Sequence, residues 1–327
     1  MTTMRELNAM EKCVKTLLSA SKVAIFSHIN PDGDTLGSSL ALYRALVLLG
    51  KQADLYCEND VKPLYSSMLG AEKYNKPTLD RYDLCVACDC GDLGRLGSLS
   101  DVFLSAKETL NIDHHKTNDR FAKVNLIFPQ ASSTCEIMFD LLKLIDEKQS
   151  CIDDDVAKLL YTGIVTDSGG FSYSNVSSHT HAVASQLLKY DFDAAAICEK
   201  YLKSITINKF YLKVRVLQNA RFFEDGAIGI IHFTQEDFAI TNTSEEDTDG
   251  LINNIRNIDG VQVALAITDT SVANSFKVSI RTTDIVDASA IASTFGGGGH
   301  KNAAGCRLNG LYEDVKDKLL KACKDNL

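Results

Sequence analysis

Near its N-terminus the chain reads Val23-Ala24-Ile25-Phe26-Ser27-His28-Ile29-Asn30-Pro31-Asp32-Gly33-Asp34. Residues 23–27 form a short apolar run, which predicts a buried strand that ends at His28. Leucines at helical spacing follow over residues 35–49, and Gly50 ends the helix that they predict. A buried strand followed by a turn and a helix is typical of a parallel α/β sheet.

The turn between this strand and helix is rich in carboxylates. Pro31 and Gly33 favour a tight turn, which can direct Asp32 and Asp34 toward a common point. The alternative is a solvated turn in which Asp34 caps the following helix. The motif by itself leaves both interpretations open.

Two further acidic clusters follow predicted strands. The strands are expected at residues 53–56, 84–88 and 110–112. Asp89 follows the second of these, and Asp113-His114-His115 follows the third. Because ligands of parallel sheets bind beyond the carboxyl ends of the strands, we expect these clusters and the His28 turn to share one site.

The rest of the chain predicts a mainly helical part and then a second α/β region. Helices are expected at residues 133–147, 153–166, 178–189, 194–219, 288–295 and 312–323, and strands at 227–234, 261–268 and 276–281. The stretch 194–219 contains no Pro or Gly. The sequence therefore predicts an α/β protein with a parallel-sheet domain over residues 1–190, a helical connector over 191–222 and a smaller α/β domain over 223–327.

The composition restricts the partners and the compartment. The chain has 327 residues and a net charge of −9, which argues against a non-specific grip on long nucleic acid. It contains no apolar run near the ~20 residues that span a bilayer. The N-terminus lacks the basic and apolar regions of a signal peptide. The ten cysteines are scattered, and Cys85-x-x-Cys88 has no second pair to complete a zinc ribbon. We expect a cytoplasmic protein that neither enters a membrane nor binds long duplexes.

The clusters together indicate a metal site. Asp167 follows a predicted helix that Gly169 and Gly170 break, and a carboxylate at a helix C-terminus is disfavoured by the helix dipole unless a cation holds it. Four aspartates, Asp32, Asp34, Asp89 and Asp167, carry four negative charges, which two divalent ions would balance. Oxygen and imidazole ligands suit manganese or magnesium better than zinc.

A run of glycines near the C-terminus indicates a second site. Gly296 to Gly299 precede His300, and Arg281 ends an earlier predicted strand. Small residues let backbone amides approach an anion closely, and an Arg and a His together can grip a phosphate. The alternative is a flexible linker.

The ordered clusters His28-x-Asn30-Pro31-Asp32-x-Asp34, Asp89, Asp113-His114-His115 and Asp167 resemble those of the DHH phosphoesterases. Residues 295–305 resemble the signature of the DHH-associated C-terminal domain. The resemblance implies that the first domain is catalytic, that the second binds substrate, and that the active site lies in the cleft between them.

The resemblance also implies roles for single residues. His28 and Asp32 would bind one ion, Asp34, His114 and Asp167 would bind the other, and Asp89 would bridge the two. His115 would contact the scissile phosphate, and Asp113 belongs to the same catalytic motif. The substrate-binding residues would be Arg281, Thr283, Gly298, Gly299 and His300. Some relatives have Ser near Arg281, where this chain has Thr282 and Thr283.

The nano-RNase group of this family is the most similar. It implies a phosphodiesterase and phosphatase with two ions, manganese or else magnesium, that degrades very short oligoribonucleotides to 5′-mononucleotides. It also implies dephosphorylation of 3′-phosphoadenosine 5′-phosphate. One alternative is a soluble phosphodiesterase of cyclic-di-AMP or linear dinucleotides. The other is a catalytically inert nucleotide-binding regulator, in which at least one of the six metal-binding residues would be missing. The expected partner is short RNA or a dinucleotide, and a homodimer is left open.

Overall fold

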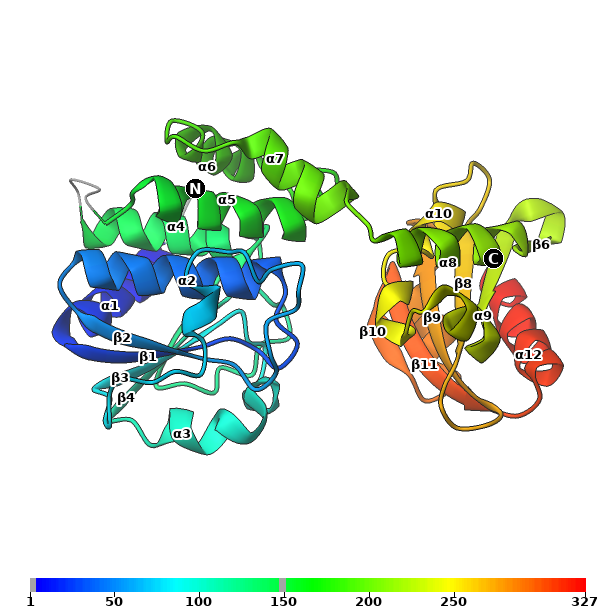
Figure 1. The fold of residues 1–327 in the computed structure, drawn as a ribbon, viewed down its shortest axis with the longest axis horizontal. Helices are drawn as coiled ribbons and strands as arrows, with labels where there is room; N and C mark the ends of the chain where they lie inside the picture. The colour runs from blue at the N-terminus through cyan, green and yellow to red at the C-terminus, as the bar shows by residue number, and fades with distance from the viewer. Residues whose placement is uncertain (1–3, 147–150) are drawn as a thin grey trace. The chain divides into compact units, whose positions relative to one another are not determined.

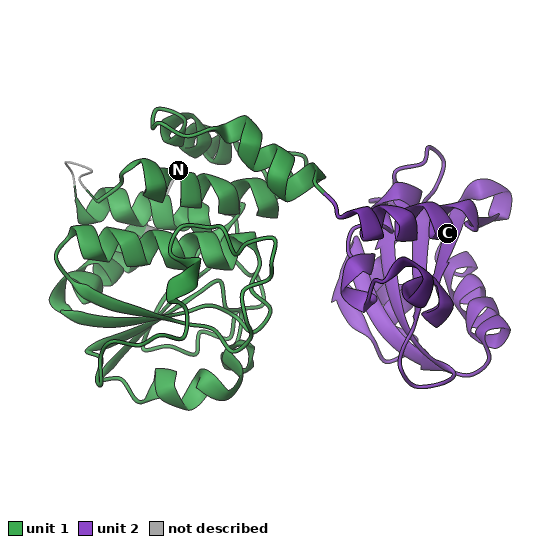
Figure 2. Cartoon of the chain, in the orientation of Figure 1, with its two compact units in different colours: residues 1–204 green, residues 205–327 purple. Residues whose placement is uncertain are grey.

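The computed structural model describes residues 4–146 and 151–327. It divides into two compact units, Met1–Ser204 and Ile205–Leu327 (Figure 2). The division falls inside the segment 191–222 that the sequence assigns to a connector. Each unit has its own sheet and its own core, and each is described by itself.

The first unit contains a five-stranded sheet in which all neighbouring strands are parallel. Its strands, from one edge to the other, are β2 (Gln52–Tyr56), β1 (Lys22–Phe26), β3 (Leu84–Cys88), β4 (Glu108–Asp113) and β5 (Val124–Ile127) (Figure 1). The chain steps outward from β1 to β2 and then returns to the other side of β1 for β3. Ligands of such sheets bind beyond the carboxyl ends of the strands at this reversal. The predicted parallel α/β fold is confirmed, with β5 as an additional short strand.

Both faces of this sheet are covered, because alternate side chains of each strand point to opposite faces. Val23 and Ile25 of β1 belong to the larger core, whereas Ala24 and Phe26 belong to the smaller one. The larger core lies under α1 (Met4–Ser19), α2 (Gly33–Leu48), α4 (Thr134–Ile145) and α5 (Asp154–Asp167), and the smaller lies over η2 (Leu93–Leu99) and α3 (Ser100–Leu104) (Figure 1). The unit also contains η1 (Ala71–Lys73), α6 (Ser178–Leu187), α7 (Ala194–Cys198) and the π-helical turn η3 (Glu199–Lys203).

Helices α2 and α5 pack unusually closely because glycines lie at their contacts. A Cβ atom on Gly37 of α2 would lie 2.7 Å from the Leu159 carbonyl oxygen of α5. A Cβ atom on Gly163 of α5 would lie 2.9 Å from Asp34 Oδ1 of α2, and 2.2 Å from Cys135 Sγ of α4. At the start of α2, a Cβ atom on Gly33 would lie 2.3 Å from Thr166 Oγ1. The beginning of α2 therefore lies directly against the end of α5, which places the Asp32 turn beside Asp167.

The second unit is built on a mixed six-stranded sheet in the order β10-β11-β9-β8-β7-β6. Only β7 and β8 pair in parallel. The strands are β6 (Arg221–Phe223), β7 (Ile228–Phe233), β8 (Val263–Asp269), β9 (Ser275–Thr282), β10 (Gly298–His300) and β11 (Ala303–Asn309). The helices are α8 (Ile207–Gln218), α9 (Gln235–Thr241), α10 (Asn253–Arg256), α11 (Ala288–Ser293) and α12 (Tyr312–Lys324), with short turns η4 (Glu224–Gly226) and η5 (Glu245–Thr248).

The structure corrects the predicted helix over residues 194–219. It is interrupted after η3, and α8 begins anew because the Thr206 side chain accepts a hydrogen bond from Lys209 N. The predicted helix 133–147 ends at Ile145, and residue 147 lies outside the described residues. The glycine run is not a flexible linker, because Gly298–His300 pair with Ala303–Gly305. A bilayer-crossing helix is not found in the described part of the chain.

The close packing of α2, α4 and α5 gives a stability prediction. Gly163→Ala adds a methyl group where Cys135 Sγ would be 2.2 Å away and Asp34 Oδ1 2.9 Å away. We expect a loss of about 1–3 kcal/mol in the free energy of unfolding, which outweighs the gain of up to ~1 kcal/mol from the higher helix propensity of alanine. Chemical denaturation measures the change. Lys158→Ala, on the exposed face of the same helix, is the control and should change stability by less than about 0.5 kcal/mol. A Gly163→Ala variant as stable as the wild type would contradict this packing.

Candidate active site

The carboxyl edge of the first sheet brings six predicted residues together. His28 follows β1, Asp89 follows β3 and His114 follows β4. His28 Nε2 lies 3.6 Å from Asp32 Oδ2 and 3.7 Å from Asp89 Oδ2. His114 Nε2 lies 3.6 Å from Asp89 Oδ1, 3.4 Å from Asp167 Oδ2 and 4.0 Å from Asp34 Oδ2.

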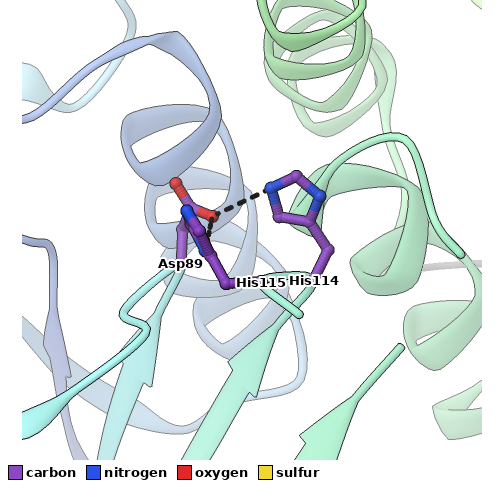
Figure 3. A group of neighbouring side chains, drawn as sticks. All are labelled: Asp89, His114 and His115. Carbon is purple, nitrogen blue, oxygen red and sulfur yellow. Dashed lines mark ion pairs between the residues drawn. The ribbon is translucent and has the colours of Figure 1, made fainter. Parts of the chain in front are cut away.

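These side chains form three overlapping groups with the geometry of metal ligands. Within each group, the candidate ligand atoms lie within 4.8 Å of one another. The groups are His28 with Asp32 and Asp89, Asp34 with His114 and Asp167, and Asp89 with His114 and His115. Figure 3 shows the last group, in which both histidine rings approach the carboxylate of Asp89. Asp89 also lies close to His28, so its carboxylate is placed between His28, which follows β1, and His114, which follows β4.

Asp32 and Asp34 are fixed by two different helices. The Asp32 side chain caps α2 and accepts hydrogen bonds from Asp34 N and Thr35 N, both at 3.1 Å. Asp32, not Asp34, is thus the helix cap. Asp34 is buried, and its carboxylate accepts from Thr134 N at 2.6 Å and Cys135 N at 2.9 Å. A helix N-terminus stabilises an anion, so α4 holds Asp34 in place.

Asp89 adopts a backbone conformation that is rare for a residue with a side chain. Its φ is 60°, in the left-handed region, although its N–H still donates to Ile112 O at 2.9 Å as in the sheet. Thr134 Oγ1 donates to Asp89 Oδ1 at 2.9 Å. Strained residues of this kind concentrate at functional sites, so the conformation marks Asp89 as a residue whose orientation matters.

His115 is oriented by a buried carboxylate. Its Nδ1 lies 2.7 Å from Asp113 Oδ1, and Asn118 Nδ2 donates to Asp113 Oδ2 at 2.6 Å. Asp113 is fully buried, and its hydrogen bond raises the pKa of His115 to about 9. Because Nδ1 lies 3.7 Å from Asp89 but 2.7 Å from Asp113, His115 is better placed to present Nε2 to a ligand than to bind a metal through Nδ1.

The carboxylates destabilise one another. Burial, together with the neighbouring charges, raises the pKa of Asp34 to about 6 and the pKa values of Asp89 and Asp167 to about 7. Divalent cations would relieve this repulsion. The donor set of carboxylate oxygens and imidazole nitrogens fits such ions. His28 Nδ1 is buried without a hydrogen-bond partner among the described residues, unlike a typical metal-bound histidine.

Three contributors to the site were not foreseen from the sequence. Thr134 and Cys135 act mainly through backbone N–H groups, which no residue type reveals. Asn118 fixes the loop after His115 by donating also to Cys90 O at 3.0 Å and Asn111 Oδ1 at 2.8 Å. Of these three residues, only Asn118 could have been suspected from the sequence, because it lies three residues beyond His115.

The predicted substrate-binding residues belong to the second unit. Ala303 pairs with Arg281 on one side and with His300 on the other. Residues directly opposite each other point to the same face of a sheet, so Arg281 and His300 flank a small alanine on one face. Gly298 pairs with Gly305, and Gly299 has φ 151°, where a Cβ atom would lie 2.5 Å from Ala303 O. Thr283 lies just beyond β9, and its hydroxyl is buried without a partner among the described residues.

Comparison with known proteins agrees with this architecture. Residues 22–164 match the DHH family, N-terminal domain, and residues 238–327 match the DHHA1 domain. The "Bifunctional oligoribonuclease and PAP phosphatase NrnA" of Thermus thermophilus is 32% identical over 93% of this chain and 90% of its own length. The "Probable bifunctional oligoribonuclease and PAP phosphatase NrnA" of Streptococcus mutans is 28% identical over 92% of this chain and 95% of its own.

A solved structure extends the likeness to three dimensions. The exopolyphosphatase-related protein from Bacteroides fragilis superposes with a TM-score of 0.89 and 26% identity, over 98% of this chain and 96% of that one. The two domain matches, the relatives and the Bacteroides fragilis structure all indicate the same family. The chain therefore belongs to the DHH family of phosphoesterases, with a DHHA1 domain in its C-terminal part.

Proposed function

We propose that this metal-dependent phosphoesterase binds two divalent ions, degrades very short oligoribonucleotides to 5′-mononucleotides and dephosphorylates 3′-phosphoadenosine 5′-phosphate. The observation that carries the proposal is the convergence of two histidines and four aspartates at the strand reversal between β1 and β3. The names of the relatives from Thermus thermophilus and Streptococcus mutans support the two substrates. The ten unpaired cysteines favour a reducing compartment, and we assign the protein to the cytoplasm.

The residues divide naturally between two ions. His28 and Asp32 would hold one, and Asp34, His114 and Asp167 the other. Asp89 would bridge them, since its two oxygens lie near His28 and His114 respectively. Divalent ions in such a site activate water and neutralise charge on phosphoryl oxygens. Manganese and magnesium fit these ligands, and we favour manganese.

The side chains around the ions would position the phosphate. The Asp113 carboxylate holds His115 with Nε2 left to donate a hydrogen bond to a phosphoryl oxygen, where developing charge is stabilised. Helix α4 fixes Asp34 through two backbone N–H groups. In the second unit, Arg281 and His300 would grip a second phosphate of the same short substrate, and the binding energy realised there would help to position the scissile bond.

The bridging role of Asp89 predicts a large loss of activity. Asp89→Asn keeps the size of the side chain but removes the charge shared by both ions. We expect hydrolysis of an RNA dimer to fall by about a thousandfold or more. Steady-state turnover measures it, and circular dichroism checks the fold. Asp80→Asn, at an exposed carboxylate before β3, is the control. A folded Asp89→Asn enzyme with near-normal turnover would refute the bridge.

The raised carboxyl pKa values predict how the metal-free protein responds to pH. Asp34, Asp89 and Asp167 bind protons more tightly when folded than their ordinary value of 3.8 implies. Their contribution to stability is therefore complete below about pH 4 and is lost as pH rises through 6 to 7. We expect the Tm of chelator-treated protein to fall between pH 5 and 8.

Metal should reverse that trend. Manganese added at pH 8 should raise the Tm and restore activity better than zinc, because the site offers no thiolate ligand. Asp89→Asn should show a shallower decline with pH. The metal assignment is wrong if chelated enzyme stays fully active, or if zinc is found bound to Cys88 and Cys90.

The clamp predicts a substrate-dependent effect of His300. His300→Ala should lower kcat/KM for an RNA dimer carrying a 5′-phosphate by about tenfold or more, since the remote grip positions the scissile bond. A simple phosphodiester reporter without a second phosphate should lose much less. Arg307→Ala, an exposed arginine on β11, is the control. Equal losses on both substrates would mean that His300 acts in the chemistry or in the fold.

A turnover panel with cyclic and linear dinucleotides tests the alternative function, a soluble phosphodiesterase of dinucleotides.

A further inference from the structure

A polar pocket opens beside His115 within the first unit. Its volume is about 610 Å³, inside the range of roughly 300–1,000 Å³ that small-molecule sites occupy. Apart from His115 it is lined by Gly91, Asp92, Leu93, Gly94, Arg95, Thr117 and Asp119. These residues follow β3 and β4, so the pocket adjoins the proposed site at His115, and the functional roles proposed above use no other residue of its lining.

The wall that carries Arg95 is fixed by its neighbours. Asp92 Oδ1 accepts a hydrogen bond from Arg95 N at 3.1 Å and begins the turn η2. Arg95 O in turn accepts from Ile29 N at 2.8 Å, which ties this turn to the loop of the first cluster. Leu96 is fully buried and anchors the turn in the smaller core.

The opposite wall is fixed as well. Asp119 N donates to Gly91 O at 2.9 Å, and Asn118 joins the same loop to Cys90 O at 3.0 Å. The loop after β3 and the loop after β4, which form the two walls, are thus hydrogen bonded to each other. A pocket that is formed before ligand binding spends little binding energy on ordering its own loops.

The side chains in the pocket indicate a nucleoside better than a phosphate. Arg95 is half-buried, and its guanidinium makes no hydrogen bond or ion pair with the described residues. A planar guanidinium of this kind can stack on a nucleobase. The carboxylates of Asp92 and Asp119 would repel a second phosphate, whereas Asp119 and Thr117 can bond to ribose hydroxyls.

We propose that this pocket binds a nucleoside attached to the scissile phosphate, with its base stacked on Arg95 and its ribose hydroxyls held by Asp119 and Thr117. The inference rests on the proposed function in one respect, that His115 faces the scissile phosphate. It assigns base and ribose recognition to the first unit, separate from the phosphate grip of Arg281 and His300. The 2′-hydroxyl contact would distinguish RNA from DNA.

The base contact is tested with Arg95→Ala, Arg95→Lys and the control Arg81→Ala, an exposed arginine before the amino end of β3. The substrates are the RNA dimer ApA and its two analogues in which one nucleotide is abasic. We expect Arg95→Ala and Arg95→Lys each to lower kcat/KM for ApA about tenfold. The loss should disappear for the one analogue that lacks the stacked base.

Two results would overturn the inference while leaving the proposed function intact. One is an equal loss on ApA and on both abasic analogues. The other is full rescue by Arg95→Lys, which would indicate a charge contact with phosphate. If the wild-type enzyme failed to hydrolyse ApA with manganese present, the proposed function itself would fail.

The ribose contact has its own test. Asp119→Ala should lower kcat/KM for the RNA dimer more than for the matching DNA dimer, so the ratio of the two constants should fall by about threefold to tenfold, the worth of one hydrogen bond. An unchanged ratio would remove Asp119 from ribose recognition and overturn that part of the proposal.

Discussion

The burial of several carboxylates close to one another is the constraint on which this site depends. Asp34 and Asp89 are almost completely buried. The His114 ring lies within 4.0 Å of both carboxylates and of the Asp167 carboxylate, so the three are close together. The pKa values of all three are raised, so the arrangement is unfavourable at neutral pH without compensation. The N-terminus of α4 compensates Asp34 in part, through two backbone hydrogen bonds. Bound cations would supply the rest, which gives the fold a strong electrostatic reason to bind them.

The rest of the first unit makes that concentration of charge sterically feasible. The strand order reverses between β1 and β3, which leaves room beyond their ends for the loops that carry His28 and Asp89. Glycines at positions 33, 37 and 163 let α2 and α5 approach closely, so that Asp32 and Asp34 meet Asp167. Asp89 takes up a left-handed conformation that turns its carboxylate toward both histidines. The close helix packing and the strained backbone of Asp89 both bring the carboxylates of the site together.

Most of the strands of the first sheet, and the site residues at their ends, could be predicted from the sequence because each is marked by a short local pattern. The strands before His28, Asp89 and Asp113 are apolar runs that end at polar residues, and the rule for parallel sheets then brings those residues together. Contacts made by backbone groups could not be predicted, such as the binding of Asp34 by α4. The break after η3 was missed because Thr206 is a weak signal within a stretch free of Pro and Gly. The glycine hairpin was missed because β10 has only three residues, and its pairing with β11 depends on tertiary contacts.

The number of manganese ions bound per chain tests the proposed two-ion site. The metal-free protein would be titrated with manganese at pH 7.5 by isothermal calorimetry, and the stoichiometry checked by elemental analysis after dialysis. Because one candidate ligand group contains His28 and another contains His114, with Asp89 between them, we expect two ions per chain. We also expect Asp89→Asn to weaken the binding of both ions. A single ion per chain, or none, would show that the proposed two-ion site is wrong.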